Sequence, residues 1–400
     1  MKKSWVRSVV VLWAVWAVVI LGFQGLAAAR VTLKRPDTVL SWTANETARN
    51  SQNGKPYLLE PFLNQQVSWD SEYYLSIAVG GYEDPVMRRV TTPDGERISQ
   101  NYAFFGFYSL LIRVVMLPFG LLGLTSIATA TLAGVLVSLL GTLAGCLALY
   151  DLCREVGGLR AVFYLLVFPS GFFLAQVYTE GVFVGLAFTA LALLDRQRWG
   201  WAALLSMAAI WARPVGVALL LAFGAAWWQW RAAHAGDWRG GLVRAVWVLI
   251  PVAAFWGWRF SIYGEGFFAV EEAFFSRQTL AVLDTVAAWS NALRVFASNN
   301  LPGKVYYAIE LGSLLIGVVG SLSMLRRYPI LGWFGLGVIG IAFFSAVPQS
   351  MARYMLVVPG IYLLLARWGR NEIVDRAWSI ISILLLGLSA ILFTFDMWAG

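Results

Sequence analysis

The chain has 400 residues and a net charge of +8; 59% of its residues are hydrophobic and only 13% are charged. Soluble domains carry about twice that charged fraction. Apolar runs of about 18 residues or more, each long enough to cross a hydrocarbon layer, recur along the chain. The composition therefore excludes an ordinary soluble protein and predicts an all-α polytopic membrane protein. The basic residues lie largely in short loops, which indicates membrane topology rather than nucleic-acid binding.

The sequence offers few residues for histidine or thiol chemistry. His234 is the only histidine, and we expect it in a cytoplasmic loop. Cys146 and Cys153 lie seven positions apart on one expected helix, which separates them by about 10 Å and is too far for a disulfide. A histidine-based triad and a zinc site are thus nearly excluded, and any proton transfer must depend on a carboxylate, a tyrosine or a lysine.

The first expected membrane helix follows a positively charged start. The apolar run of residues 9–29 ends in Ala27-Ala28-Ala29, which is similar to a signal-peptide cleavage site. The run is longer than the core of a signal peptide, so we expect an uncleaved helix. Its basic flank places the N-terminus in the cytoplasm.

A long polar interval over residues 30–101 follows, and we expect it outside the cytoplasm. Trp69, Tyr73 and Ile77 recur at helical spacing within residues 67–82, which predicts a helix lying flat on the membrane.

The next segment, residues 102–123, is apolar but is interrupted by Arg113, Pro118 and Gly120. A full crossing there would place Arg154 and Arg160 on the outer side, against the positive-inside rule. We therefore expect an interfacial or re-entrant helix.

The whole chain, residues 1–400, is expected to form one membrane domain with about eleven transmembrane helices. Basic clusters between the apolar segments alternate as cytoplasmic loops, so we expect the C-terminus outside. A second extracytoplasmic loop is expected over residues 264–304. The apolar segments lie near residues 124–150, 161–176, 178–194, 199–212, 214–230, 244–263, 305–325, 330–347, 351–366 and 376–397.

The first outer loop contains the acidic motif Trp69-Asp70-Ser71-Glu72-Tyr73-Tyr74. Asp70, beside aromatic rings at the membrane face, is a candidate general base for a sugar hydroxyl. Alternatively, it is an N-cap or a surface acid of the interfacial helix. Asp70 and Glu72 also resemble an acidic tether for Mg²⁺ or Mn²⁺, so a divalent cation remains an open alternative.

These residues, with later blocks in the same order and spacing, resemble the PIG-V family of mannosyltransferases and its prokaryotic relatives. The similarity runs from about residue 65 to 360. The relatives often carry prolines where this chain has Gly106-Phe107-Tyr108. The matching blocks are Trp69 to Ala78, Gly81-Tyr82, Ala103-Phe104-Phe105 with Tyr108 and Leu111-Ile112-Arg113, Phe168 to Phe173, Tyr178-Thr179-Glu180, Ala212 to Gly216, and Ser350 to Tyr354.

The resemblance implies a GT-C glycosyltransferase fold. Such enzymes take a sugar, here mannose, from a polyprenyl-phosphate carrier and transfer it on the outer face of the membrane with inversion. An acidic residue of the first outer loop serves as base, and Asp70 is the matching position. The acceptor would be a glycolipid, a glycan or a protein hydroxyl, and the implied location is a prokaryotic plasma membrane with the site facing outward.

A departing lipid phosphate needs cations, and Arg353, Arg213 and Arg113 are the candidates. An arginine inside an apolar segment must pair or face a polar cavity, so the alternative for Arg213 and Arg353 is an ion pair with Glu180 or Glu310, or snorkelling to the interface. The expected substrate-binding residues are Trp69, Glu72, Tyr73, Tyr74, Tyr82, Tyr178, Glu180 and Tyr354.

Two other functions remain open at this stage. A transporter or lipid flippase is one, although the sequence lacks the internal repeat typical of that class. A noncatalytic membrane subunit of another enzyme is the other.

Overall fold

The computed structural model describes residues 4–92, 95–275, 277 and 281–400. Within them the chain is almost entirely helical, and its strands form a single antiparallel hairpin with Val90 opposite Ile98. The strands are β1 (Arg89–Thr91) and β2 (Arg97–Ser99). The helices are α1 (Ser4–Arg30), α2 (Thr43–Glu46), α3 (Ser71–Val79), α4 (Gly106–Phe119), α5 (Ser126–Cys153), α6 (Gly158–Leu166), α7 (Glu180–Asp195), α8 (Trp199–Ala212), α9 (Leu219–Ala233), α10 (Trp238–Arg259), α11 (Ile262–Ala273), α12 (Val282–Arg294), α13 (Leu301–Met324), α14 (Pro329–Phe343), α15 (Met351–Met355), α16 (Pro359–Trp368) and α17 (Glu372–Thr394).

The all-α membrane architecture expected from composition is confirmed. Of the described helices, five are long and apolar enough to cross a membrane: α1, α5, α10, α13 and α17. Shorter apolar helices accompany them at Gly106–Leu122, Trp199–Ala212 and Pro329–Phe343. Some expected segments contain a short 3-10 turn, as at residues 171–175 and 214–218. Prolines mark two helix boundaries. Pro214 separates α8 from α9, between the expected segments 199–212 and 214–230, and Pro359 separates α15 from α16 within the expected segment 351–366.

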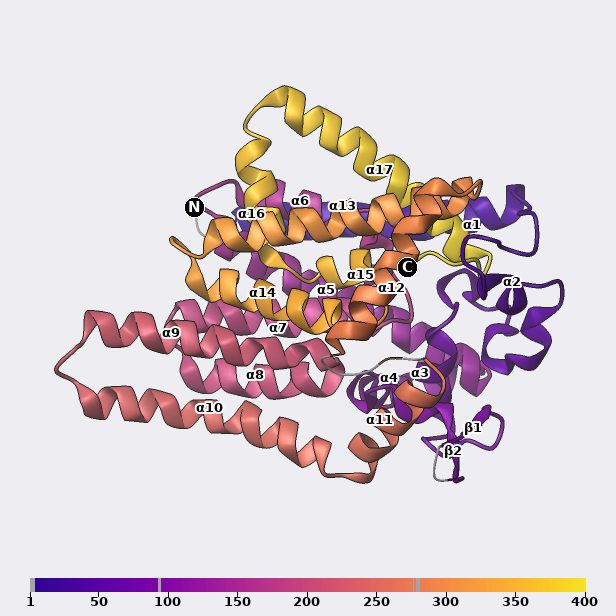
Figure 1. Cartoon of the computed structure of the whole chain (residues 1–400), viewed down its shortest axis with the longest axis horizontal. Coiled ribbons are helices and arrows are strands. Elements are labelled where there is room, and N and C mark those ends of the chain that lie inside the picture. Colours follow the sequence, from indigo (N-terminus) through magenta and orange to yellow (C-terminus); the bar gives the residue numbers. More distant parts are fainter. Residues whose placement is uncertain (1–3, 93–94, 276, 278–280) are drawn as a thin grey trace.

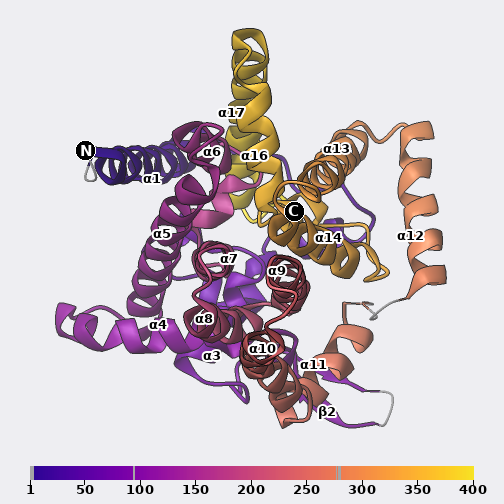
Figure 2. The ribbon, with the colours of Figure 1, turned by 90° about the vertical axis from the view of Figure 1, so that its left-hand side faces the viewer.

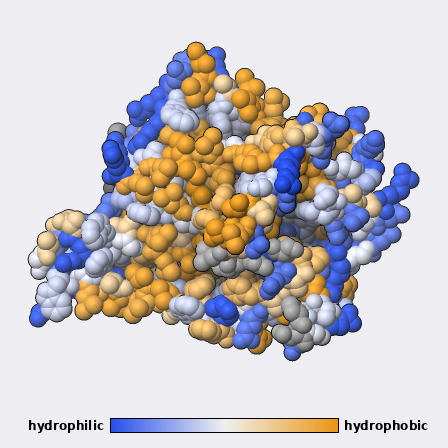
Figure 3. Space-filling view, in the orientation of Figure 1, coloured by the Kyte–Doolittle hydropathy of each residue, from blue (hydrophilic) through white to orange (hydrophobic). Residues whose placement is uncertain are grey.

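Helices α8, α9, α10, α13 and α14 lie roughly parallel, with the α9–α10 connection at one end of the molecule and α2, α3 and the β hairpin at the other (Figure 1). We call residues 31–104 the cap. Viewed from the end, α4 runs across the bundle and α12 stands apart from it (Figure 2). Hydrophobic side chains gather over the middle of the face in Figure 3, with hydrophilic ones toward both ends. This distribution fits a bundle that crosses a bilayer.

Close packing of α5 on α7 depends on four glycines. Gly141 and Gly145 of α5 face Gly181 and Gly185 of α7. A Cβ atom at Gly185 would lie 2.5 Å from the carbonyl oxygen of Gly141, and one at Gly141 would lie 2.7 Å from that of Gly181. This is the small-xxx-small pattern that lets membrane helices approach closely. It fixes the start of α7, where Glu180 lies, against α5.

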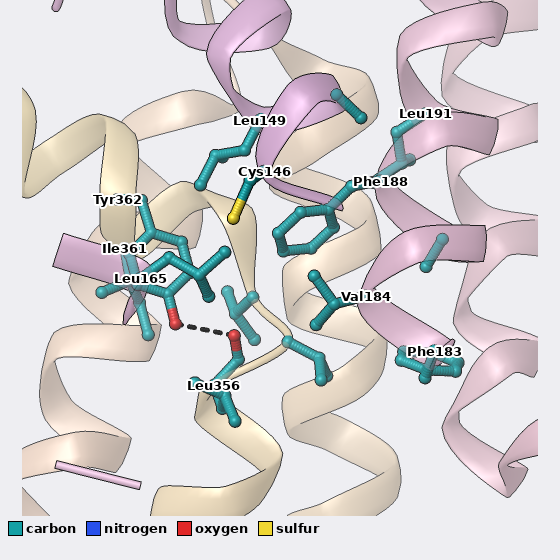
Figure 4. Close-up of a cluster of buried hydrophobic side chains, with 14 of the residues drawn as sticks. Cys146, Leu149, Leu165, Phe183, Val184, Phe188, Leu191, Leu356, Ile361 and Tyr362 are labelled. Atoms are coloured by element: carbon teal, nitrogen blue, oxygen red, sulfur yellow. Dashed lines mark hydrogen bonds between the residues drawn. The ribbon is translucent and has the colours of Figure 1, made fainter. Parts of the chain in front are cut away.

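The expected helix at residues 351–366 is broken between α15 and α16. Val358 is extended (φ −96°, ψ 101°), as favoured before a proline, and Pro359 starts α16. The Tyr362 hydroxyl donates to the carbonyl oxygen of Leu356 at 2.6 Å, which satisfies a backbone group freed by the break (Figure 4). Figure 4 also shows the buried side chains around the break, among them Cys146, Leu149, Leu165, Phe183 and Phe188. Both cysteines are free and buried.

The cap is fastened by residues that follow α17. Lys55 of the cap contacts Asp396 at 3.3 Å, and both side chains are buried. The other oxygen of Asp396 accepts the backbone N–H of Trp69 at 3.4 Å. The Trp69 indole donates to the carbonyl oxygen of Met397 at 3.0 Å. The acidic motif is therefore held from one side by the segment 396–397.

Glu72 is a second buried ionisable group of the cap. Its side chain is 3% exposed and lies 3.9 Å from the Arg88 guanidinium. Burial raises the pKa of Glu72 from 4.5 to about 7, and the positive charges of Arg88 and Lys55 only partly oppose this rise. Glu72 lies on α3, outside the five long apolar helices.

The packing of α5 on α7 can be tested with Gly185→Ala. The added methyl group has no room, and overpacking costs about 1–3 kcal/mol, so the melting temperature of the purified protein in detergent should fall. Gly224→Ala on α9 is the matched control, because its Cβ would meet nothing within 4 Å. Equal melting temperatures for the two variants would contradict this account of the helix contact.

The burial of Glu72 predicts a pH-dependent stability. Its folded-state pKa lies above the unfolded value, so the folded wild type binds the proton more tightly and loses stability as the pH rises from about 5 to 7. Glu72→Gln cannot ionise, and its stability relative to wild type should rise by about 2–3 kcal/mol over that range. Melting temperatures at pH 5 and pH 8 measure the change, with exposed Glu265→Gln as control. A difference between E72Q and wild type that stays constant with pH would refute the assignment.

Candidate active site

A cavity of about 1100 Å³ lies between the cap and the ends of the helices. It gathers charged side chains from parts of the chain that are far apart in sequence. Asp70 comes from the start of α3, Glu180 from the start of α7, Arg213 from the end of α8, and Arg353 from α15. Three of these four residues lie at the beginning or the end of a helix, and the side chains of all four line the cavity.

The four charges form one connected cluster. Arg353 Nη1 lies 2.7 Å from Asp70 Oδ2, and its Nε lies 3.3 Å from Glu180 Oε1. Arg213 Nη1 contacts the same oxygen of Glu180. The Glu180 side chain is 1% exposed, so one buried carboxylate is shared by two guanidinium groups. Of the two counter-ions expected for these arginines, the structure uses Glu180.

Local sequence explains how the two arginines reach the cavity. Arg213 precedes Pro214 and is therefore extended (φ −153°, ψ 145°), which ends α8 at this point. Arg353 follows Ser350, whose backbone is left-handed (φ 68°). Glu310 of α13 holds this turn by accepting the backbone N–H of Ser350 at 3.0 Å and that of Ala352 at 2.6 Å. Glu310 thus positions the segment that carries Arg353 rather than pairing with the arginine.

Asp70 is held at the N-terminal end of α3. Its backbone N–H donates to the Tyr178 hydroxyl at 3.1 Å, and the preceding Trp69 is left-handed (φ 49°). The Asp70 side chain is 21% exposed. Oδ2 faces Arg353, whereas Oδ1 accepts no hydrogen bond from any residue that the structure describes. Asp70 therefore presents one carboxylate oxygen that is free to accept a proton in the cavity.

The residues of the acidic motif do not fit a divalent metal site. Asp70 faces Arg353, and Glu72 faces Arg88, so the two carboxylates meet different cations of the protein. The neighbouring Asp84 accepts hydrogen bonds from the Tyr57 and Ser76 hydroxyls. Within the described ranges, no group of three or more His, Cys, Asp or Glu side chains is placed to hold a metal ion. We derive no chemical step through Mg²⁺ or Mn²⁺.

Most of the expected site residues line the cavity. The described lining contains, besides the four charged residues, the following expected substrate-binding residues: Trp69, Glu72, Tyr73, Tyr74 and Tyr354. Tyr73 donates its hydroxyl to Gln100 at 2.9 Å, so its orientation is fixed.

Three expected site residues do not line the cavity. Arg113 of α4 donates to the carbonyl oxygens of Ile77 and Ala78, both at 2.9 Å, and so caps the C-terminal end of α3. The Tyr82 hydroxyl donates to the carbonyl oxygen of Phe104. Tyr178 is 1% exposed and lies behind Asp70. Arg113 is therefore not brought to the other arginines, because its donors serve the backbone of α3.

Sequence reasoning missed five charged residues of the cavity lining. Glu46, Lys55 and Arg88 come from the first expected outer loop. Glu271 and Arg277 come from the second, residues 264–304, which in the structure contains α11 and α12. Arg277 Nη1 donates to the Tyr354 hydroxyl at 3.0 Å. Burial raises the pKa of Glu271 from 4.5 to about 7, and the positive charge of Arg277 opposes that rise. The position of both residues in an outer loop was the signal available in the sequence.

Comparison with known proteins finds similar enzymes over part of the chain. The chain is 34% identical over 152 residues to GPI alpha-1,6-mannosyltransferase 2 of Mus musculus, and 33% identical over 152 residues to that of Cricetulus griseus. Each match covers 36% of this chain and 28% of the relative, so the chain matches less than a third of their length. No protein-family model matches the chain.

Among solved structures, the chain is similar to the crystal structure of the Archaeoglobus fulgidus oligosaccharyltransferase tethered with an acceptor peptide. The TM-score is 0.43 and the sequence identity is 16%, with coverage of 100% of this chain and 56% of the other. The resemblance to PIG-V mannosyltransferases noted in the sequence is thus confirmed by the curated relatives, over about a third of the chain.

Proposed function

We propose that the protein is an inverting glycosyltransferase of the GT-C type that transfers mannose from a polyprenyl-phosphate carrier to a hydroxyl group on the outer face of the membrane. The observation that carries the proposal is the cluster of Asp70, Arg353, Glu180 and Arg213 in one cavity. It combines a free carboxylate oxygen with cations suited to a phosphate. The similarity to mannosyltransferases supports the choice of sugar.

The proposed reaction is a single displacement. The acceptor oxygen attacks the anomeric carbon, and its proton passes to Oδ1 of Asp70. The bond between the anomeric carbon and the phosphate oxygen breaks on the opposite side, and its electron pair leaves with the polyprenyl phosphate. Attack opposite to the leaving group inverts the anomeric centre. Asp70 returns the proton to solvent, since its side chain is 21% exposed.

The cationic end of the cavity suits the leaving group. Negative charge grows on the phosphate as its bond to the sugar breaks, and oriented guanidinium groups stabilise such charge. Arg353 contacts Asp70 directly, so the proposed base and the proposed phosphate-binding group are adjacent. Glu180 keeps both arginines pointing into the cavity. This arrangement orients the groups before the substrates bind, which lowers the cost of reaching the transition state.

The size and lining of the cavity are compatible with two substrates. A volume of about 1100 Å³ exceeds that of most pockets for a single small molecule. Its walls combine the charged cluster with aromatic residues such as Trp69, Tyr73 and Phe104. Aromatic faces and polar groups together suit sugars, so the cavity has room for the donor sugar and an acceptor. The proposed acceptor is a hydroxyl of a glycolipid, a glycan or a protein, and the proposed setting is a prokaryotic plasma membrane with the cavity facing outward.

A transfer assay with the full chain tests the function. Purified protein is incubated with radiolabelled polyprenyl-phosphate-mannose and membrane extract, and labelled lipids, glycans and proteins are separated. The wild type should transfer label, and Asp70→Asn should lower the rate about 10²–10⁴-fold, as expected for loss of a general base. Asp284→Asn, an exposed change on α12, is the matched control and should keep full activity.

Two outcomes would overturn parts of the proposal. If the wild type transfers no label to any acceptor with several polyprenyl-phosphate sugars, the enzyme assignment fails. If Asp70→Asn retains wild-type activity, another group must act as base. Melting temperatures of both variants show whether a loss of activity reflects unfolding.

A further inference from the structure

The arginines of the central cluster are already neutralised within the protein. Arg213 and Arg353 carry two positive charges, and Glu180 and Asp70 carry two negative charges within contact distance. A phosphodiester entering the cavity would bring another negative charge, and this charge would grow when the sugar leaves. A buried negative charge without a cation is costly. The cluster alone therefore lacks one positive charge for an anionic donor.

Arg277 supplies a positive charge in the same cavity. It lines the cavity beside Tyr354, and its guanidinium donates to the Tyr354 hydroxyl at 3.0 Å. Its backbone N–H donates to the carbonyl oxygen of Glu271 at 3.0 Å, which ties it to the end of α11. No carboxylate in the described part of the chain lies within ion-pair distance of its guanidinium. Arg277 is thus a cavity cation hydrogen-bonded to a neutral phenol. The nearby Glu271 interacts with it electrostatically, but burial favours the neutral form of that carboxyl, so Glu271 offsets only part of the charge.

The neighbouring turn offers further hydrogen-bond donors. Ser350 and Tyr354 lie four residues apart at the start of α15, and both line the cavity. Ser350 is 1% exposed, and its hydroxyl has no hydrogen-bond partner among the residues described. A buried hydroxyl on a cavity wall without a partner is a group that a ligand can satisfy. Arg277, Tyr354 and Ser350 therefore combine one charge with two hydroxyl groups.

We propose that Arg277, with the hydroxyls of Tyr354 and Ser350, forms an anion subsite that binds the phosphate of the lipid-linked donor. The inference rests on the proposed function, because it assigns the donor phosphate within that reaction. Arg277 pairs with the single negative charge of the bound phosphodiester. When the sugar leaves, the phosphate gains a second negative charge, which Arg277 and Arg353 stabilise together. Arg213 and Glu180 then act mainly to orient Arg353.

Initial-rate kinetics with the full chain test the subsite. A charge-assisted hydrogen bond contributes about 1.5–3 kcal/mol, so Arg277→Gln should raise the KM for polyprenyl-phosphate-mannose by about 10–100-fold and leave the KM for the acceptor unchanged. Arg277→Lys should restore part of the affinity, because it keeps the charge but not the fork of donors. Arg294→Gln, an exposed change on α12, is the matched control and should behave as wild type.

Binding of polyprenyl phosphate without sugar gives a readout that does not depend on turnover. The lipid should raise the melting temperature of the wild type and of Arg294→Gln, and this shift should be lost in Arg277→Gln. If Arg277→Gln is folded and keeps both the wild-type donor KM and the wild-type shift, the subsite is refuted while the transferase stands. If the wild type binds polyprenyl phosphate through Arg277 but transfers no sugar, the subsite stands and the proposed function fails.

Discussion

The site depends on one buried carboxylate held between two guanidinium groups. Glu180 has a side-chain exposure of 1%, and a single oxygen of this residue contacts both Arg213 and Arg353. Taking an isolated charge out of water costs several kcal/mol, so none of these three groups is stable in this place without the others. Asp70 completes the cluster through Arg353. The interaction joins α3, α7, α8 and α15, and the relative positions of these helices are therefore coupled to the electrostatics of the cavity.

The surrounding backbone holds these charged residues in position. Four glycines bring α7 against α5, so the start of α7 and its Glu180 cannot shift easily. Prolines stop α8 beside Arg213 and separate α15 from α16. Glu310 and Tyr362 satisfy backbone groups around the broken segment. Short helices with satisfied ends are thus the means by which polar side chains enter an otherwise apolar bundle.

The sequence predicted site residues correctly where both the residue type and its position beside an apolar segment pointed to the cavity. Asp70 was singled out by its acidic motif and its match to PIG-V, and Arg213 and Arg353 because an arginine in an apolar segment needs a partner such as Glu180. The structure brings all four together. Arg113 also lies in an apolar segment, but it donates hydrogen bonds to backbone carbonyl groups of α3. This contact depends on the direction of α4, which the sequence does not reveal. Arg277 was missed because nothing in its neighbourhood distinguishes it from other loop arginines. The breaks within the expected segments 161–176 and 351–366 were missed, because hydropathy does not register a break at a proline or a 3-10 turn.

The contact between the segment 396–397 and Trp69 also bears on how the protein is made. The two partners of the hydrogen bond from Trp69 to Asp396 are 327 positions apart in sequence. During synthesis, the acidic motif therefore leaves the ribosome long before the segment 396–397 that contacts it. During this interval Lys55 and Trp69 lack the Asp396 carboxylate that they contact in the folded chain. The contact that holds the acidic motif from this side therefore forms only after residue 396 has been synthesised.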